Sequence, residues 1–237
     1  MSGDAATLAV SGLTSGYGEA IVVRGVSITV APGEIVALLG KNGMGKSTLL
    51  KTVMGFLPAR EGQVTLHGRD VTHDPPHRIA RQAIAYTPQE QAIFQDLTVG
   101  DNLRLGQSKT EWFEVELARV GEVFPFLKER LGQRAGTLSG GEQKMLLIAR
   151  ALMARPKLML VDEISEGLQP SIIERLAEAL VAERDRTGVA MLLVEQNVRF
   201  ALKVADRWAV LKRGEIDDEG RSDAPDAAAR IADHLSV

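Results

Sequence analysis

The sequence of 237 residues contains no cysteine, which excludes disulfide bridges, thiolate metal sites and cysteine nucleophiles and suits a reducing compartment. Histidine is also rare, with four residues in the chain. His73 and His77 are four positions apart, but Pro75 and Pro76 lie between them and prevent a shared helical face. His234 stands alone near the C-terminus. We therefore expect no metal site built from protein side chains alone.

Long apolar runs are missing as well. Runs such as residues 189–194 have the length of a strand and fall far short of the roughly 18–20 residues that span a bilayer. Residues 1–6 contain no basic stretch followed by an apolar core, so we expect no signal peptide. The net charge of −3 favours neither general nucleic-acid binding nor electrostatic membrane anchoring. These features predict a soluble, cytoplasmic chain that reaches a membrane only through partners.

A glycine-rich loop, residues 40–48, separates the apolar run 35–39 from a segment typical of a helix. Its two glycines five positions apart, followed by Lys46 and Ser47, form the pattern of a phosphate-binding P-loop. Glycines let backbone N–H groups turn towards phosphate oxygens, and the helix adds the positive end of its dipole. Lys46 would reach the outer phosphates, and the Ser47 hydroxyl would sit on Mg²⁺. The loop residues predicted to bind the nucleotide are Gly40, Asn42, Gly43, Gly45, Lys46, Ser47 and Thr48. A glycine-rich turn in an unrelated α/β fold is the alternative, which the flanking segments disfavour.

Two carboxylates, Asp162 and Glu163, follow the apolar run 158–161. Such a run is typical of a buried parallel strand, and ligands bind beyond the carboxyl ends of these strands. Asp162 is therefore placed to hold Mg²⁺ through water, and Glu163 to polarise an attacking water. The alternative, two acids in a solvated loop, is disfavoured by the P-loop upstream.

A second helix start is predicted at residues 138–143. Ser139 followed three positions later by Glu142 forms a capping box, and Gly140 and Gly141 open the amides of the first turn. This is a second anion-binding helix end in the same chain. An ordinary capped loop would explain the capping but not the second group of open amides.

The organisation read from the chain is α/β, and its length suits one large domain or one domain with a subdomain. Apolar and polar residues alternate in short runs within residues 7–39, which predicts an antiparallel sheet that leads into the buried strand before the P-loop. A hairpin turning at His67 and Gly68 follows. Helical periodicity dominates from about residue 97, where Thr98 is a predicted N-cap, to residue 154. We expect a further buried strand at 189–194, a final strand pair near 208–215 and a short helix in 224–237. No internal repeat is evident, so we expect a single nucleotide cassette.

Tyr17 stands between two glycines in a segment, 15–18, that is predicted to be a loop. An aromatic ring there could stack on a base, as aromatic rings do on nucleobases. On the residues alone, a turn tyrosine that packs on the sheet is the favoured reading.

With the P-loop and the 138–143 motif both in place, the chain resembles the ATP-binding cassette (ABC) ATPases over roughly residues 8–220. The resemblance implies a P-loop NTPase core with an antiparallel β-subdomain and an inserted α-helical subdomain, all within one ABC ATPase domain, 1–237. The core plus β-subdomain would cover about 7–88 and 155–220, the helical subdomain about 89–154, and a C-terminal tail 221–237.

The resemblance also implies roles for single residues. Tyr17 resembles the aromatic that stacks on adenine, and Gln89 resembles the glutamine that contacts Mg²⁺ and the lytic water and faces the membrane partner. Ser139, Gly140 and Gly141 resemble the signature that reaches the γ-phosphate of a nucleotide on a second cassette. Two sites would therefore form only in a head-to-tail dimer. Glu163 resembles the catalytic carboxylate.

Three departures from the family pattern accompany this likeness. Gln196 stands where the family usually has histidine, and an amide can hydrogen-bond a γ-phosphate but cannot carry a charge or shuttle a proton. Ile164 stands where proline is usual, and Gln169 where aspartate is common in the loop that signals across the dimer. We expect weak or partner-dependent ATPase activity, with Gln196 in a catalytic role.

Three segments most resemble the group that takes up branched-chain polar and hydrophobic amino acids: residues 94–103, 194–197 and 205–207. This group also serves urea and short amides, and a related branch drives lipopolysaccharide export. The amino-acid systems commonly have two distinct ATPase subunits, and the chain resembles the smaller type. The resemblance implies ATP and Mg²⁺ as cofactors, a second ABC ATPase subunit in a homo- or heterodimer, transmembrane permease subunits and an extracytoplasmic solute-binding protein. It implies a peripheral position on the inner face of the cell membrane.

Two alternatives from other classes remain. A nucleic-acid- or ribosome-associated ABC ATPase usually has two cassettes, a coiled-coil insertion or basic patches, and none of these is visible in the sequence. A regulatory ATP-binding subunit without useful catalysis is motivated by Gln196, whereas Glu163 and the intact signature argue against it.

Overall fold

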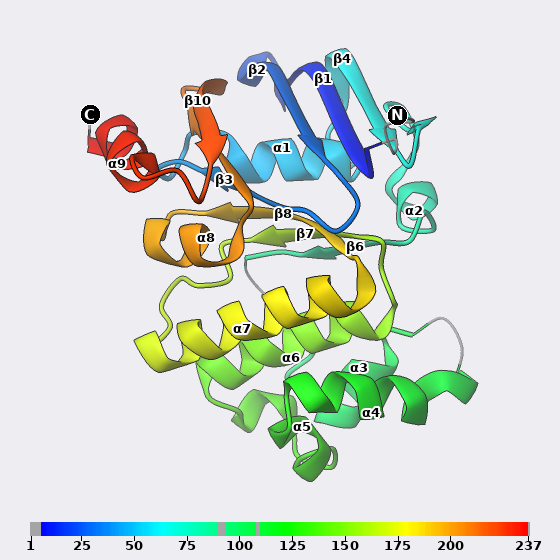
Figure 1. The fold of residues 1–237 in the computed structure, drawn as a ribbon. Helices are drawn as coiled ribbons and strands as arrows, with labels where there is room; N and C mark the ends of the chain where they lie inside the picture. Colours follow the sequence, from blue (N-terminus) through cyan, green and yellow to red (C-terminus); the bar gives the residue numbers. More distant parts are fainter. Residues whose placement is uncertain (1–5, 90–92, 108–109, 237) are drawn as a thin grey trace, which may run out of the picture.

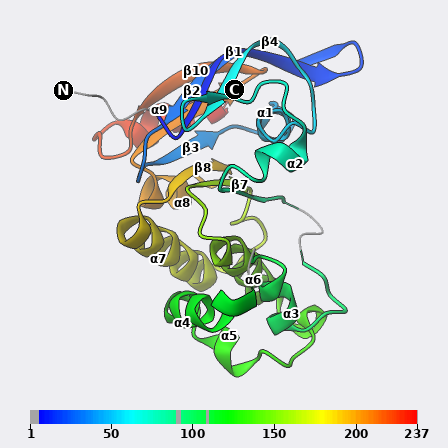
Figure 2. The same ribbon diagram turned by 90° about the vertical axis from the view of Figure 1, so that its right-hand side faces the viewer.

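The computed structural model describes residues 6–89, 93–107 and 110–236 (Figure 1). The expectation that no signal peptide is present falls mostly on residues 1–5, outside the described residues. Seen from two directions, an antiparallel sheet lies at one end of the molecule, a larger sheet at its middle and a group of helices at the other end (Figures 1 and 2).

The four-stranded sheet has the order β2-β1-β4-β5 and is antiparallel, as the alternation of residues 7–39 predicts. The turn between the third and fourth strand falls at His67 and Gly68, which both have positive φ, as a tight two-residue hairpin turn requires. The predicted hairpin is thus confirmed. Its strands are β1 (Leu8–Tyr17), β2 (Ala20–Val30), β4 (Ala59–Leu66) and β5 (Arg69–Asp70).

The predicted loop at residues 15–18 is wrong. Ser15, Gly16 and Tyr17 are the last residues of β1, where Gly16 pairs with Ile21. A Cβ on Gly16 would lie 1.9 Å from the carbonyl oxygen of Ala20, so the glycine permits close pairing in the hairpin. Tyr17 is 47% exposed, so its side chain is about half covered.

The six-stranded sheet has the order β10-β9-β3-β8-β7-β6. Every neighbouring pair is parallel except β9 and β10, which form the expected final antiparallel pair. The strands β3, β7 and β8 are buried along their whole length, because layers cover both faces of the sheet. The strands are β3 (Ile35–Leu39), β6 (Ile84–Thr87), β7 (Leu158–Asp162), β8 (Ala190–Glu195), β9 (Arg207–Lys212) and β10 (Glu215–Arg221).

Helix α1 (Lys46–Val53) lies between the two sheets (Figure 1). Its Leu49 and Leu50 are fully buried in one hydrophobic cluster with Leu13 of β1 and Leu192 of β8. This packing fixes the helix that begins at the P-loop against both sheets. The short helix α2 (Pro76–Ile79) follows the β4–β5 hairpin.

The opposite face of the larger sheet carries α6, α7 and α8, with α3, α4 and α5 beyond them (Figure 2). The helical periodicity predicted for 97–154 is confirmed, although it is divided into short elements. Thr98 is the observed N-cap of α3, with its side chain accepting from the Asp101 N–H. Helix α7 ends before Gly188, which adopts the left-handed conformation that commonly terminates helices. The bounds are α3 (Val99–Arg104), η1 (Thr110–Trp112), α4 (Phe113–Val123), α5 (Phe126–Glu129), η2 (Ala135–Thr137), α6 (Gly140–Met153), α7 (Pro170–Thr187) and α8 (Val198–Val204).

The expected helix of the C-terminal segment is α9 (Ala227–Ser236), which packs against α8, β9 and β10. His234 Nδ1 lies 2.6 Å from an Asp217 carboxylate oxygen. Within the described ranges, none of the helices combines the length and apolar character needed to cross a bilayer. In that same part of the chain, no three His, Asp or Glu side chains are placed to share a metal ion.

Candidate functional site

The P-loop connects the carboxyl end of β3 to α1 and fits closely between neighbouring elements. A Cβ on Gly40 would lie 2.6 Å from the Leu211 carbonyl oxygen of β9. Gly45, with φ of 104°, precedes α1, and a Cβ there would lie 3.2 Å from the Val22 carbonyl oxygen of β2. Close backbone approach therefore requires glycine at position 40, and the positive φ together with this tight contact favours glycine at position 45. The β1–β2 hairpin, which carries Tyr17 at the end of β1, thus packs against the P-loop.

Lys46 is buried beside the loop, and its Nζ has three oxygen partners. It donates to the carbonyl oxygens of Gly40 at 2.8 Å and Lys41 at 2.9 Å. The third partner is Glu163, whose Oε1 lies 2.9 Å away. Both charged side chains are almost completely removed from water, which is tolerated because each neutralises the other.

Glu163 directly follows β7 and has φ of 48°, a left-handed conformation that is uncommon outside glycine. Its N–H donates to the Val194 carbonyl oxygen of β8 at 2.9 Å, which holds the residue in this geometry. Backbone strain of this kind concentrates at functional sites, where the surrounding structure maintains it.

Two amides hold the second carboxylate oxygen of Glu163. Gln89 Nε2 lies 2.9 Å and Gln196 Nε2 lies 3.0 Å from Oε2. Gln196 Nε2 also donates to Asn42 Oδ1 of the P-loop at 2.8 Å. Because β3, β6, β7 and β8 are parallel, the residues that follow their carboxyl ends gather at one edge of the sheet. The structure thus brings Asn42, Lys46, Gln89 and Gln196 together around one carboxylate.

Asp162, the last residue of β7, faces the start of α1. Its Oδ1 accepts from Ser47 Oγ at 3.2 Å, and its Oδ2 lies 3.5 Å from the Tyr86 hydroxyl. Burial raises the pKa of Asp162, although the Ser47 hydrogen bond opposes the rise. Burial, followed by the charge of Asp162, also raises the pKa of Tyr86. A hydroxyl and a carboxylate oxygen are hard donors of the kind Mg²⁺ prefers, so Ser47 and Asp162 fit this ion.

Gln89, which was also expected to contact Mg²⁺, does not share the hydrogen bond between Ser47 and Asp162. In the part of the chain that the structure describes, its side-chain hydrogen bonds run to Glu163 and Glu166 rather than to Ser47 or Asp162.

The 138–143 motif forms the capping box that the sequence predicts. Ser139 Oγ accepts from the Glu142 N–H at 3.3 Å, and Glu142 Oε2 accepts from the Ser139 N–H at 2.9 Å. A Cβ on Gly141 would lie 3.1 Å from a methyl carbon of Ile172, so this helix start packs against the first turn of α7. The segment is thus held by its own cap and by its contact with α7.

A cavity of about 340 Å³ adjoins Glu163 and Asn42 of the P-loop. The residues Ser139, Gly140 and Gly141 do not belong to its lining, which consists of Asn42, Glu163, Ser165, Glu166, Gly167, Leu168, Ile173, Glu195, Gln196 and Asn197.

Sequence reasoning missed several side chains at this edge. Glu195, the last residue of β8, is 1% exposed and accepts hydrogen bonds from the Ser165 N–H and Oγ, at 3.0 and 2.7 Å. Burial raises the pKa of Glu195 despite these bonds. Lys144 of α6 donates to the carbonyl oxygens of Glu163, at 3.4 Å, and Glu166. For Glu195 a signal was present, namely a carboxylate at the end of a buried run, as in residues 158–163.

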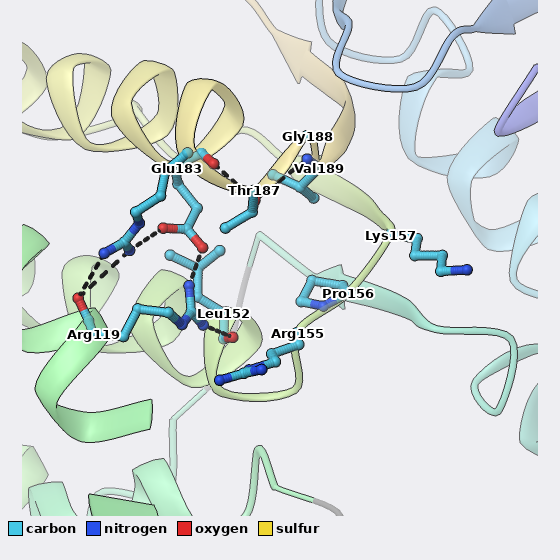
Figure 3. Close-up of a pocket in the computed structure, with 10 residues that line it drawn as sticks. Arg119, Leu152, Arg155, Pro156, Lys157, Glu183, Thr187, Gly188 and Val189 are labelled. Carbon is cyan, nitrogen blue, oxygen red and sulfur yellow. Dashed lines mark hydrogen bonds and ion pairs between the residues drawn. The ribbon is translucent and has the colours of Figure 1, made fainter. Parts of the chain in front are cut away.

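A second cavity, of about 420 Å³, lies between α4, α6 and α7 (Figure 3). Arg119 of α4 donates to Glu183 of α7, and to Glu116 at 2.8 Å. Arg155 also pairs with Glu116 and Arg186 with Glu183, so the two buried carboxylates are neutralised by arginines.

Lys157 and Val189, which precede β7 and β8, also line the cavity. The cavity therefore lies at the amino ends of these strands, opposite the edge that carries the P-loop. The ion pair between Arg119 and Glu183 connects α4 to α7 beside it.

The chain is similar in sequence and in structure to known proteins. The model of the family described as ABC transporter matches residues 23–166. The high-affinity branched-chain amino acid transport ATP-binding protein BraG of Pseudomonas aeruginosa is 47% identical, covering 84% of this chain and 86% of that protein. The lipopolysaccharide export system ATP-binding protein LptB of Escherichia coli K12 is 36% identical, covering 91% and 90%. The ADP conformation of MJ1267, an ATP-binding cassette of an ABC transporter, superimposes with a TM-score of 0.87 at 27% identity, covering 98% and 97%.

Proposed function

This chain belongs to the ABC transporter family as an ATP-hydrolysing subunit, and from that premise we propose that it powers the uptake of branched-chain or related amino acids. The support for this solute class is the identity with BraG, 47%, against 36% with the lipopolysaccharide export protein. We also propose a core plus β-subdomain over about 7–88 and 155–220, a helical subdomain over about 89–154, and a tail over 221–237.

The proposed ATP site begins with the P-loop. Backbone N–H groups of Gly43 and Gly45 and the ammonium of Lys46 would bind the phosphates, with Asn42 and Thr48 beside them and the ring of Tyr17 on the adenine. Ser47 and Asp162 would hold Mg²⁺, with Gln89 near it, and the ion would neutralise charge developing on the phosphate oxygens.

Glu163 is the proposed base that takes a proton from the attacking water. Its Oε1 is paired with Lys46 at 2.9 Å, so both groups are held close to where the terminal phosphate would sit. A phosphate at Lys46 supplies a competing negative charge, which leaves Oε1 free to accept the proton. Gln89 and Gln196 hold the other oxygen and orient the carboxylate. Gln196 would also donate to the γ-phosphate.

The proposed assembly is a head-to-tail pair of ATPase subunits, identical or distinct. Ser139, Gly140 and Gly141 would complete the site of the partner, which accords with their absence from the lining of the cavity at Glu163. ABC transporter ATPases act with transmembrane permease subunits and are membrane-associated. For this chain we propose the inner face of the cell membrane and an extracytoplasmic solute-binding protein in the same system.

The Glu163→Gln variant tests the catalytic assignment. Without the base, kcat for ATP should fall by about 10²–10⁴-fold. ATP binding and ATP-dependent dimerisation should persist, because the P-loop is intact. Steady-state hydrolysis and size-exclusion chromatography with Mg²⁺-ATP measure both, with Glu178→Gln on the exposed face of α7 as the matched control. Unchanged hydrolysis by Glu163→Gln would contradict the assignment.

The solute class is tested separately. Deletion of the gene should reduce the uptake of radiolabelled leucine by cells, and re-expression of the chain should restore it. Undiminished leucine uptake would contradict the proposed solute but leave the ATPase assignment intact.

A further inference from the structure

The side-chain amide of Gln89 is shared between two carboxylates. Its Nε2 lies 2.9 Å from Glu163 Oε2 and 2.7 Å from Glu166 Oε2. A primary amide nitrogen has two hydrogens, so each carboxylate takes one of them. Hydrogen bonds to a charged acceptor are stronger than neutral ones, and both of these are of that kind. The amide is thereby fixed with its nitrogen towards Glu163.

The backbone of Glu166 is held from two sides. Lys144 of α6 donates to its carbonyl oxygen and to that of Glu163. The preceding residue, Ser165, is buried and is bound through its N–H and its hydroxyl by Glu195 of β8. Glu166 itself is exposed, yet its main chain has little freedom. Its side chain therefore extends to Gln89 from a main chain that is held in place.

Within the described residues, the hydrogen bonds of the Gln89 side chain run to these two carboxylates. Its side chain has three rotatable bonds, and fixing such a side chain carries a large entropic penalty. With Glu166 present, two acceptors hold the amide. With Glu163 alone, one bond would have to hold it, and the amide would spend part of its time turned away from the carboxylate.

We propose that Glu166 is a positioning residue for ATP hydrolysis, which holds the amide of Gln89 on the carboxylate of Glu163. This role rests on the proposed function of the chain as an ATPase with Glu163 as its base. Glu166 bonds neither Lys46 nor the P-loop glycines in the described part of the chain, so it affects turnover rather than ATP binding.

The test compares Glu166→Ala with Glu166→Gln in the full-length chain. Glu166→Ala should lower kcat about fivefold, equivalent to about 1 kcal/mol, with KM for ATP unchanged within about twofold. Glu166→Gln should keep most of the wild-type kcat, because its carbonyl oxygen can still accept from Gln89. In the Gln89→Ala background, Glu166→Ala should have no further effect. Glu178→Ala is the matched control, and the thermal unfolding midpoint of each variant checks folding.

Three results would overturn the proposal. They are an unchanged kcat in Glu166→Ala, an equal loss in Glu166→Gln, and an undiminished effect of Glu166→Ala in the Gln89→Ala background. If any of these occurs while the wild type hydrolyses ATP and Glu163→Gln does not, the positioning role is wrong and the proposed function stands. A wild-type chain that fails to hydrolyse ATP with its transporter partners would refute both.

Discussion

Lys46 of α1 and Glu163 after β7 form an ion pair whose side chains are 3% and 4% exposed, with 2.9 Å between Nζ and Oε1. The pair connects the phosphate-binding loop to the proposed base through the protein's own side chains. Each charge is therefore both a functional group and the partner that makes the burial of the other tolerable.

Removal of one charge of this pair should destabilise the fold. Lys46→Met leaves Glu163 buried without its cation, and we expect the free energy of unfolding to fall by about 3–5 kcal/mol. The double variant Lys46→Met with Glu163→Gln should lose less, since no uncompensated charge remains. Urea unfolding without nucleotide measures both, with Lys51→Met on the same helix as the control. Equal losses in the single and double variants would show that the charge pair is not the cause.

The buried carboxyl of Glu195 should make stability depend on pH. Burial raises the pKa of Glu195 above the ordinary value of 4.5, so the carboxyl binds a proton more tightly in the folded state than in the unfolded chain. The resulting stabilisation of the folded state is complete below about pH 4.5 and is lost as the pH rises through the folded-state pKa. Glu195→Gln cannot titrate and escapes this loss. The unfolding free energy of Glu195→Gln minus that of the wild type should therefore increase as the pH rises above about 4.5, measured by urea unfolding. A pH-independent difference would contradict the raised pKa.

Gln196 should limit the pH response of catalysis, because an amide does not titrate. Gln196→His introduces a side chain with an ordinary pKa of about 6.5, so the pH profile of kcat should gain an ionisation near that value. Gln196→Ala removes the bonds to Glu163 and Asn42 and should lower kcat about tenfold. Hydrolysis assays from pH 5.5 to 8.5 compare both with the wild type. A profile of Gln196→His that matches the wild type would exclude a role for this side chain near the reacting groups.

Ser139 combines a structural and a proposed catalytic role, which two variants separate. Ser139→Ala and Glu142→Ala each break one half of the capping box and should each lower the unfolding free energy by about 1 kcal/mol. Only Ser139→Ala should also reduce kcat strongly, since Ser139 is the residue proposed to contact the partner's nucleotide. Urea unfolding and steady-state ATP hydrolysis give the two readouts. Equal kcat in the two variants would leave Ser139 with the capping role alone.

Tyr17 shows where local reasoning fails. Two flanking glycines predict a loop, whereas the strand continues through Gly16 because β1 and β2 approach too closely there for a side chain. The glycine marks a close backbone contact within a tight hairpin, and the flanking glycines alone did not distinguish this from a loop. The capping box at Ser139 shows the opposite case, since its geometry involves only four consecutive residues and was predicted correctly.

The sequence by itself determined the elements whose physics is local: the strand, glycine loop and helix around Lys46, the buried strand that ends in Asp162, and the capped start of α6. Their residue types and spacing suffice, because hydrogen bonds and backbone conformation act over a few residues. Tertiary structure alone decided that Gln89, Glu163 and Gln196 share hydrogen bonds, since this depends on parallel strands from distant segments ending at one edge. It also decided that Glu166 reaches Gln89, because the buried Glu195–Ser165 contact and Lys144 fix the loop between them.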